Sequence, residues 1–372
     1  MNKILLVALL ALSAGTILHS QSISLPDGGV NQKCWTGQRI GVTDIEIHWN
    51  APGVKGREGK IWGTPIAHYG FTDIGFGTAK SSPWRAGANE CTSMSFSTDV
   101  RIEGKLLPAG KYGFFIAVYP DSCTLIFNKN AAAWGAYFYK PEEDVLRVTV
   151  RQQKDLPQSR EWLSYTFSDP TARSMVVAME WERWRIPFRV EADFEQTTLA
   201  SIRQQLSGGM GFDGQSLQAA AQWCVTNNTN FEEAHLWITR ATDPRLGGLD
   251  NFAVLSTKAG IERKLGKTAD ADKTMQTALG KATVVEMHGY GRQLVGQKKY
   301  AEALAVFQKN YEKNAGVWPT QVGLARGYSA NGDLKKALEH AKAALSQAPD
   351  DVNRTSLEAM IKTLSEGKAL AQ

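Results

Sequence analysis

Cysteine is scarce in this chain, and no sign of charge dominates it. The four cysteines among 372 residues have irregular spacings and include no C-x-x-C pair. This excludes a zinc ribbon or a thioredoxin-type redox motif, and buried free thiols explain the cysteines more simply than a disulfide framework does. The 42 basic and 37 acidic residues give a formal charge of only +5. That balance does not indicate a nucleic acid as partner.

Motifs of well-known active sites are also missing. The sequence has no H-E-x-x-H, G-x-S-x-G or P-loop motif. Residues 209–214 fit G-x-G-x-x-G, but they follow a predicted helix instead of a strand, so we interpret them as part of a linker. The histidines are isolated, and a zinc site would have to combine distant residues such as His48, His68 and Glu90. We therefore predict no metal site and no cofactor.

No apolar run of the sequence is long enough to span a bilayer, which takes about 20 apolar residues. Residues 1–20 combine Lys3 with an apolar run from Ile4 to Leu12 and with small residues before Gln21. This pattern is typical of a cleaved signal peptide, with an uncleaved anchor as the alternative. The expected mature protein is periplasmic or secreted, without a membrane span.

Short apolar runs fill residues 21–195, and turn-forming residues separate them. Ile45, Ile47 and Trp49 alternate with polar residues, which is the period of a half-buried strand. About nine such runs predict an antiparallel β-sandwich, either jelly-roll or Ig-like. Residues 196–216 are then predicted as a helix followed by a Gly-rich linker.

The period becomes helical over residues 217–372, and this part of the chain repeats itself. Gly291 aligns with Ala325, and Ala303 aligns with Ala337, both at an offset of 34 residues. Fainter copies precede these two units. The spacing and the small residues resemble the tetratricopeptide repeat. The resemblance implies an α-solenoid of paired antiparallel helices that cross at small residues. It also implies a scaffold that contacts other proteins, with a packing adaptor for the first domain as the alternative.

The β-rich half carries a second resemblance, most specific at W-R-x-G-A-N-E over residues 84–90. The supporting segments are VKGREGKIWG at 54–63, DVLRVTV at 144–150 and AMEWERWRIPF at 178–188. In their order and spacing, residues 33–190 resemble the domain of unknown function family 2911 of secreted bacterial proteins. This resemblance implies no established activity.

One set of polar and aromatic residues is the candidate binding site of the β-rich half: His48, Arg57, Trp84, Arg85, Asn89, Glu90, Asn128 and Lys129. A guanidinium binds a carboxylate or phosphate through two parallel hydrogen bonds, and an indole supplies a stacking wall. The alternative is a structural loop held by an ion pair between Arg85 and Glu90, with Asn89 capping the turn.

These observations favour an exported noncatalytic binding or scaffolding protein whose helical repeats contact protein partners. A small ligand at the β-sandwich is a further candidate partner. The alternative is an extracytoplasmic hydrolase with a polar cleft formed by His48, Arg85 and Glu90. A cleft that joins these three residues, with Glu90 unpaired, would favour the hydrolase.

Overall fold

The structure, a computed structural model, describes residues 30–246, 248–314 and 316–371. The chain divides into two units, Met1–Ala200 and Ser201–Gln372, and the division falls within helix α1 (Phe194–Leu206). The predicted signal peptide lies outside the described residues. Over the ranges that the structure describes, no helix is both long and apolar enough to cross a membrane.

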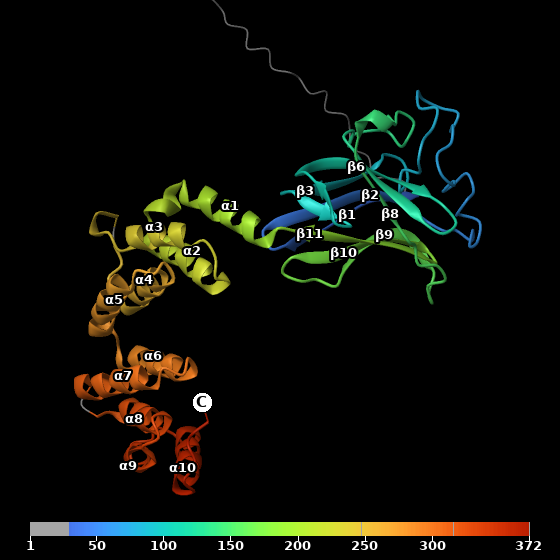
Figure 1. Cartoon of the computed structure of the whole chain (residues 1–372). Helices are drawn as coiled ribbons and strands as arrows, with labels where there is room; N and C mark the ends of the chain where they lie inside the picture. The colour runs from blue at the N-terminus through green and yellow to red at the C-terminus, as the bar shows by residue number, and fades with distance from the viewer. Residues whose placement is uncertain (1–29, 247, 315, 372) are drawn as a thin grey trace, which may run out of the picture. The chain divides into compact units, whose positions relative to one another are not determined.

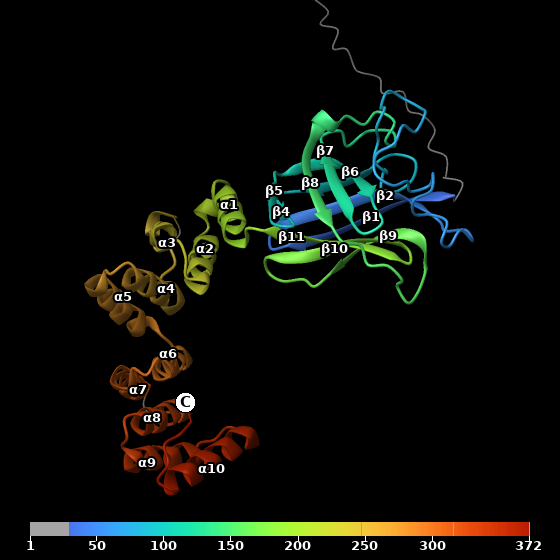
Figure 2. The same cartoon turned by 45° about the vertical axis from the view of Figure 1, so that its right-hand side comes forward.

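The first unit is an antiparallel β-sandwich, as predicted, and Figures 1 and 2 show its two sheets as two layers. The six-stranded sheet has the order β1 (Asn31–Ile40), β2 (Thr43–Pro52), β3 (Thr92–Phe96), β6 (Gly110–Val118), β7 (Cys123–Asn128) and β8 (Asp144–Val150). The five-stranded sheet has the order β5 (Lys105–Leu107), β4 (Val100–Ile102), β11 (Trp184–Ala192), β10 (Ser174–Glu182) and β9 (Arg160–Ser168).

The core of this unit lies between the sheets. On β2, Ile45 is buried while the adjacent Glu46 is exposed, as the sequence alternation predicts. Phe188 of one sheet lies 5.9 Å from Phe114 and 6.4 Å from Phe127 of the other, measured between ring centroids. Interdigitated aromatic rings of this kind bury much apolar area and hold the two layers together.

A cluster of tryptophans extends this core into the long segment between β2 and β3. The rings of Trp62 and Trp184 stack at 4.4 Å, and those of Trp84 and Trp181 stack at 6.0 Å. Trp62 also meets Trp84 edge-on, at 5.6 Å. The cluster therefore anchors two points of the long segment, one of them the start of the W-R-x-G-A-N-E motif, to the core.

The second unit is built from consecutive helix pairs (Figure 1). The pairs are α2 (Gly214–Asn227) with α3 (Phe231–Ala241), α4 (Phe252–Lys264) with α5 (Thr268–Lys281), α6 (Val284–Gly296) with α7 (Tyr300–Lys313), and α8 (Trp318–Ala330) with α9 (Leu334–Leu345). Helix α10 (Asp351–Ser365) packs on α9. Helix α2 also contacts α4, and α6 contacts α8, so the first helices lie beside one another in the first two pairs and in the last two pairs. This is the predicted tetratricopeptide-like α-solenoid.

Small residues occupy the helix crossings. Ala303 and Ala337 are completely buried. Gly291, Gly323 and Gly327 pack around the ring of Phe307, and a Cβ at these positions would lie 2.4, 2.6 and 2.8 Å from that ring. A larger side chain would force the helices apart, which explains why the repeat keeps small residues here.

The Gly-rich segment after α1 forms a short 3₁₀ turn over Gly209–Phe212. Nη2 of Arg240 on α3 donates a hydrogen bond to the carbonyl of Gly211 at 2.7 Å. Asp213 then caps α2 by accepting a hydrogen bond from the amide of Ser216 at 2.7 Å. The G-x-G-x-x-G match therefore lies between two helices and is tied to a third, without the strand that a dinucleotide fingerprint requires.

Candidate functional site

The W-R-x-G-A-N-E segment forms a tight loop just before β3. Ala86 and Asn89 have φ angles of 52° and 53°, in the left-handed region that most side chains avoid. The carbonyl of Ala86 accepts hydrogen bonds at 2.9 Å from the hydroxyls of Thr92 and Tyr165. Left-handed backbone at non-glycine residues persists only where the surroundings enforce it, and it concentrates at functional sites.

The side chain of Arg85 is held by this loop and by an aromatic residue that is far away in the sequence. Its Nη1 donates a hydrogen bond to the Asn89 carbonyl at 3.0 Å, and its Nη2 donates to the Tyr137 hydroxyl at 3.2 Å. The guanidinium carbon lies 4.9 Å from the centroid of the Tyr137 ring. A Cβ at Gly135 would lie only 2.6 Å from Nη1, so glycine at this position leaves room for the guanidinium.

Glu90 has partners of its own. Its carboxylate lies 3.0 Å from Nζ of Lys33 and accepts a hydrogen bond from Nδ2 of Asn50 at 2.7 Å. Burial alone would raise the pKa of Glu90, but hydrogen bonds from its own backbone, Lys33 and Asn50 outweigh it and lower the pKa. The expected ion pair between Arg85 and Glu90 is not formed within the described residues, because each side chain is engaged elsewhere.

A pocket of about 310 Å³ lies beside the loop. We call it the arginine pocket and define it by Arg57, His68, Trp84, Arg85 and Asn89, all of which line it. Trp181 lines it as well. No aspartate or glutamate is among its described lining residues, so two guanidiniums face this space without a carboxylate.

Arg57 is fixed by backbone carbonyls. Its Nε donates a hydrogen bond to Val54 at 2.9 Å, and its Nη2 donates to Gly53 at 2.7 Å. These contacts hold one edge of the guanidinium. Because a guanidinium has five N–H donors, others remain available for a ligand.

His68 enters the arginine pocket although the sequence suggested it only as a candidate zinc ligand. Burial lowers the pKa of His68, the Tyr69 backbone partly offsets that effect, and the nearby charge of Arg85 lowers the pKa further. The imidazole is therefore neutral at pH 7. In the sequence, the one feature that could have linked His68 to this pocket is its position in the same long segment between β2 and β3 as Arg85.

His48 and Glu90 line a different pocket, of about 550 Å³. His48 is exposed on β2, and its Nε2 lies 3.6 Å from the carboxylate of Glu46. The structure therefore does not join His48 and Glu90 with Arg85, and the three residues form no common cleft.

Asn128 and Lys129 line neither pocket. Asn128 is buried, and its Nδ2 donates hydrogen bonds to Asp144 at 2.8 Å and to the Lys140 carbonyl at 3.1 Å. Its Oδ1 accepts a hydrogen bond from the amide of Asn130 at 2.9 Å. These contacts tie the end of β7 to the loop that follows, so Asn128 has a structural position, and Lys129 is an exposed side chain beside it.

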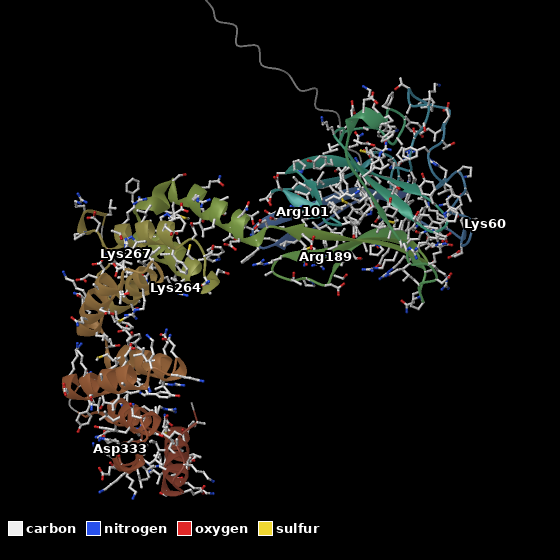
Figure 3. All side chains as sticks on the ribbon, in the orientation of Figure 1. Lys60, Arg101, Arg189, Lys264, Lys267 and Asp333 are labelled. Atoms are coloured by element: carbon white, nitrogen blue, oxygen red, sulfur yellow. The ribbon has the colours of Figure 1, made fainter. Side chains whose placement is uncertain are left out.

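The second unit has a groove along the first helices of its pairs. Two adjoining pockets of about 680 and 320 Å³ share Gly289 and Gln293 of α6. Together they form what we call the helical groove. Its apolar lining includes Phe252, Met275, Tyr290 and Leu294, and its basic lining consists of Arg263, Lys264, Arg292, Lys299 and Arg326. Lys264, which is labelled in Figure 3, lies on α4 and lines this groove.

Two arginines without an ion-pair partner among the described residues lie at one end of the helical groove. Arg292 and Arg326 line the same pocket, and neither forms an ion pair with another described residue. Burial and the charge of Arg292 lower the pKa of Arg326, whose buried Nε has no hydrogen-bond partner in the described part of the chain. An incoming carboxylate would offset the repulsion between the two guanidiniums.

Comparison with known proteins supports both resemblances. Residues 32–190 match the model of a protein family of unknown function, DUF2911, and residues 294–361 match a tetratricopeptide repeat model. No curated protein matches the chain.

Several solved structures are similar to the helical part. YrrB, a TPR protein with an unusual peptide-binding site, shares 19% identity over 44% of this chain and 83% of its own, with a TM-score of 0.28. A tetratricopeptide repeat protein from Parabacteroides merdae ATCC 43184 shares 19% identity over 47% of this chain and 68% of its own, with a TM-score of 0.30. MamA from Desulfovibrio magneticus RS-1 shares 19% identity over 43% of this chain and 92% of its own, with a TM-score of 0.28. The amino-terminal half of the chain thus resembles the DUF2911 family, and the carboxyl-terminal half resembles tetratricopeptide repeats.

Proposed function

We propose that the chain is an exported, noncatalytic binding or scaffolding protein whose repeats hold a segment of a protein partner. The observation that carries this proposal is the helical groove, which follows α2, α4, α6 and α8 and is lined by apolar side chains and by five basic side chains against one acidic, Glu286. A groove of this kind fits an acidic segment that also carries apolar residues, because both components gain from binding. The resemblance to tetratricopeptide repeats supports the same conclusion.

The apolar part of the groove gives it an anchoring site. Phe252 and Tyr290 meet edge-on with their ring centroids 6.2 Å apart, and both line the larger of the two pockets. Buried aromatic residues near the centre of an interface contribute most of its binding energy. We therefore expect an apolar side chain of the partner to insert between α4 and α6.

The basic part of the groove sets the charge of the partner. Lys299 faces Glu302 at 3.5 Å and Arg263 faces Asp272 at 2.5 Å, whereas Arg292 and Arg326 have no such neighbour among the described residues. The unpaired arginines are therefore the expected contacts of acidic side chains.

Export is the second part of the proposal. It rests on the leader-like residues 1–20, which indicate a periplasmic or secreted protein. The hydrolase alternative receives no support from the geometry, since His48, Arg85 and Glu90 do not share a pocket and Glu90 is paired.

Site-specific photo-crosslinking in the native cells tests the proposed groove. A photoreactive amino acid replaces Ser256 or Gln293 in the groove, and matched variants carry it at the exposed Thr277 of α5 or Lys309 of α7. We expect one and the same protein partner to crosslink at both groove positions and at neither control position. Crosslinks that are as strong at Thr277 and Lys309, or that occur only there, would place the contact outside the groove.

A charge reversal tests the electrostatic part. Arg292→Glu should weaken the crosslinked complex, and Lys309→Glu on α7 should leave it unchanged. If both reversals have the same effect, the groove arginines do not select the partner.

A further inference from the structure

The arginine pocket combines cations, amides and indoles but has no acidic lining residue among those described. Charged side chains in a cleft are normally compensated by an opposite charge. Neither Arg57 nor Arg85 has an ion-pair partner in the part of the chain that the structure describes, since their polar contacts are to carbonyls and to the Tyr137 hydroxyl. The missing component of this pocket is an anion.

The two guanidiniums are held in place before any ligand arrives. Hydrogen bonds to two backbone carbonyls fix Arg57. Hydrogen bonds to the Asn89 carbonyl and the Tyr137 hydroxyl fix Arg85, and Gly135 leaves room for its guanidinium. A preorganised guanidinium loses little conformational entropy on binding, and its planar fork suits the two oxygens of a carboxylate or phosphate.

Two residues that line the pocket carry a buried polar atom without a normal hydrogen bond. Trp181 is fully buried, yet its indole N–H has no hydrogen-bond partner among the described residues. Nδ1 of His68 is likewise buried without a hydrogen bond of normal geometry. Neither atom has appreciable accessible surface, so the polar groups of this pocket that a ligand can reach are the guanidiniums of Arg57 and Arg85.

The remaining wall is aromatic and apolar. Trp84 lines the pocket together with Ile66, Ile74 and three prolines, Pro52, Pro65 and Pro83. Small-molecule sites typically have such a lining with a few well-placed polar groups, and a volume of about 310 Å³ suits a small ligand.

We propose that the arginine pocket binds a small organic anion. Its oxyanion group, a carboxylate or a phosphate, accepts hydrogen bonds from Arg85 and Arg57, and its apolar part packs against the half-buried side chains of Ile66 and Ile74. The site belongs to the β-sandwich unit and does not depend on the helical groove or on its protein partner.

Titration of the full chain with three matched probes tests this proposal. Benzoate and phenyl phosphate carry the two candidate oxyanion groups, and benzamide is the neutral analogue of benzoate. The readout is the set of ¹H–¹⁵N shifts of the tryptophan indoles and arginine Nε groups. We expect saturable shifts with at least one anion and none with benzamide, and the tighter anion identifies the group.

Variants then locate the site. Arg85→Ala should weaken binding of the tighter probe roughly tenfold to a hundredfold, as expected for a lost charge-assisted hydrogen bond. Gly135→Ala keeps the charge but displaces the guanidinium, and it should weaken binding as well. Arg101→Ala is the matched control, because Arg101 is an exposed arginine on β4, as Figure 3 shows. It should bind as the unaltered protein does.

Three outcomes would overturn the proposal. The first is the absence of saturable shifts with either anion at millimolar concentration. The second is equal binding of benzoate and benzamide. The third is equal weakening by Arg85→Ala and Arg101→Ala, which would indicate general surface attraction. The first two comparisons need only the unaltered protein, so they hold even where a variant fails to fold.

Discussion

Phe307 is surrounded by three glycines, and one added methyl group at any of them would collide with its ring. We expect Gly291→Ala to lower the free energy of unfolding by about 1–3 kcal/mol, because an overpacked core must shift its backbone or its rotamers. The measurement is chemical unfolding of the full chain.

Gly289 is the matched control for this change, since it lies on the same helix and a Cβ there would meet nothing within 4 Å. Gly289→Ala should therefore raise the free energy of unfolding, by about 0.5–1 kcal/mol, because alanine favours the helix. The two substitutions lie only two residues apart on one helix, and they should change the free energy of unfolding in opposite directions. This difference distinguishes the effect of packing from the effect of helix propensity. A destabilising Gly289→Ala would contradict this account.

His288 lies beside Phe307, and it should make the stability of the fold depend on pH. Burial lowers the pKa of His288 to about 4, and the charge of Arg326 lowers it in the same direction. The unfolded chain keeps an ordinary histidine pKa of about 6.5, so it takes up this proton first. The free energy of unfolding should therefore fall as the pH drops from about 6.5 to about 4.

His288→Gln should remove this contribution, because glutamine does not titrate and its amide can still donate to the Pro319 carbonyl that lies 3.0 Å from Nδ1. The measurement is the free energy of unfolding of both proteins between pH 8 and pH 4. Their difference should stay constant above about pH 7 and change only below it. A constant difference over the whole range would show that His288 does not couple folding to pH.

At the scale of the elements, the helix crossings test the repeat register. Ala303→Leu on α7 and Ala337→Leu on α9 should each cost about 1–3 kcal/mol, since both alanines are completely buried. Ala301→Leu lies on the exposed side of α7 and should cost much less. Thermal unfolding distinguishes the two cases, and equal losses at Ala301 and Ala303 would mean that the register is wrong.

The elements themselves were largely predictable. Alternation at Ile45 and Ile47 identified a strand of the sandwich, and the offset of 34 residues between Ala303 and Ala337 identified the helix pairs. Both signals are local or periodic, so a single sequence contains them.

The candidate site was less predictable because distant segments complete it. Trp84, Arg85 and Asn89 do line one pocket together with Arg57, as the candidate set suggested. However, the residues that fix Arg85 are Gly135 and Tyr137, about 50 residues away. No spacing rule connects these positions, and nothing local indicates that Ala86 has a positive φ.

At the scale of the whole molecule, the predicted leader bears on where the protein acts. We predict that export removes residues 1–20, so that the mature chain starts near Gln21. Sequencing the amino terminus of the protein purified from the extracytoplasmic fraction checks this. Recovery of intact Met1 from the cytoplasm would contradict the predicted export.

All four cysteines are free, and three of them are buried. Burial raises the pKa of the Cys91 thiol to about 11 and that of Cys123 to about 12. Such thiols form almost no thiolate at neutral pH and react slowly. The fold therefore does not depend on a disulfide between any of the four.

The tryptophan cluster has an optical consequence. Trp62, Trp84, Trp181 and Trp184 lie with neighbouring ring centroids 4.4 to 6.0 Å apart. Indoles this close share electronic excitation, so they absorb circularly polarised light as a coupled set with intense near-ultraviolet dichroism. Two of the four line the arginine pocket, and a molecule that enters it would change the coupling. The β-sandwich thus contains its own spectroscopic probe, which reports on that pocket without any attached dye.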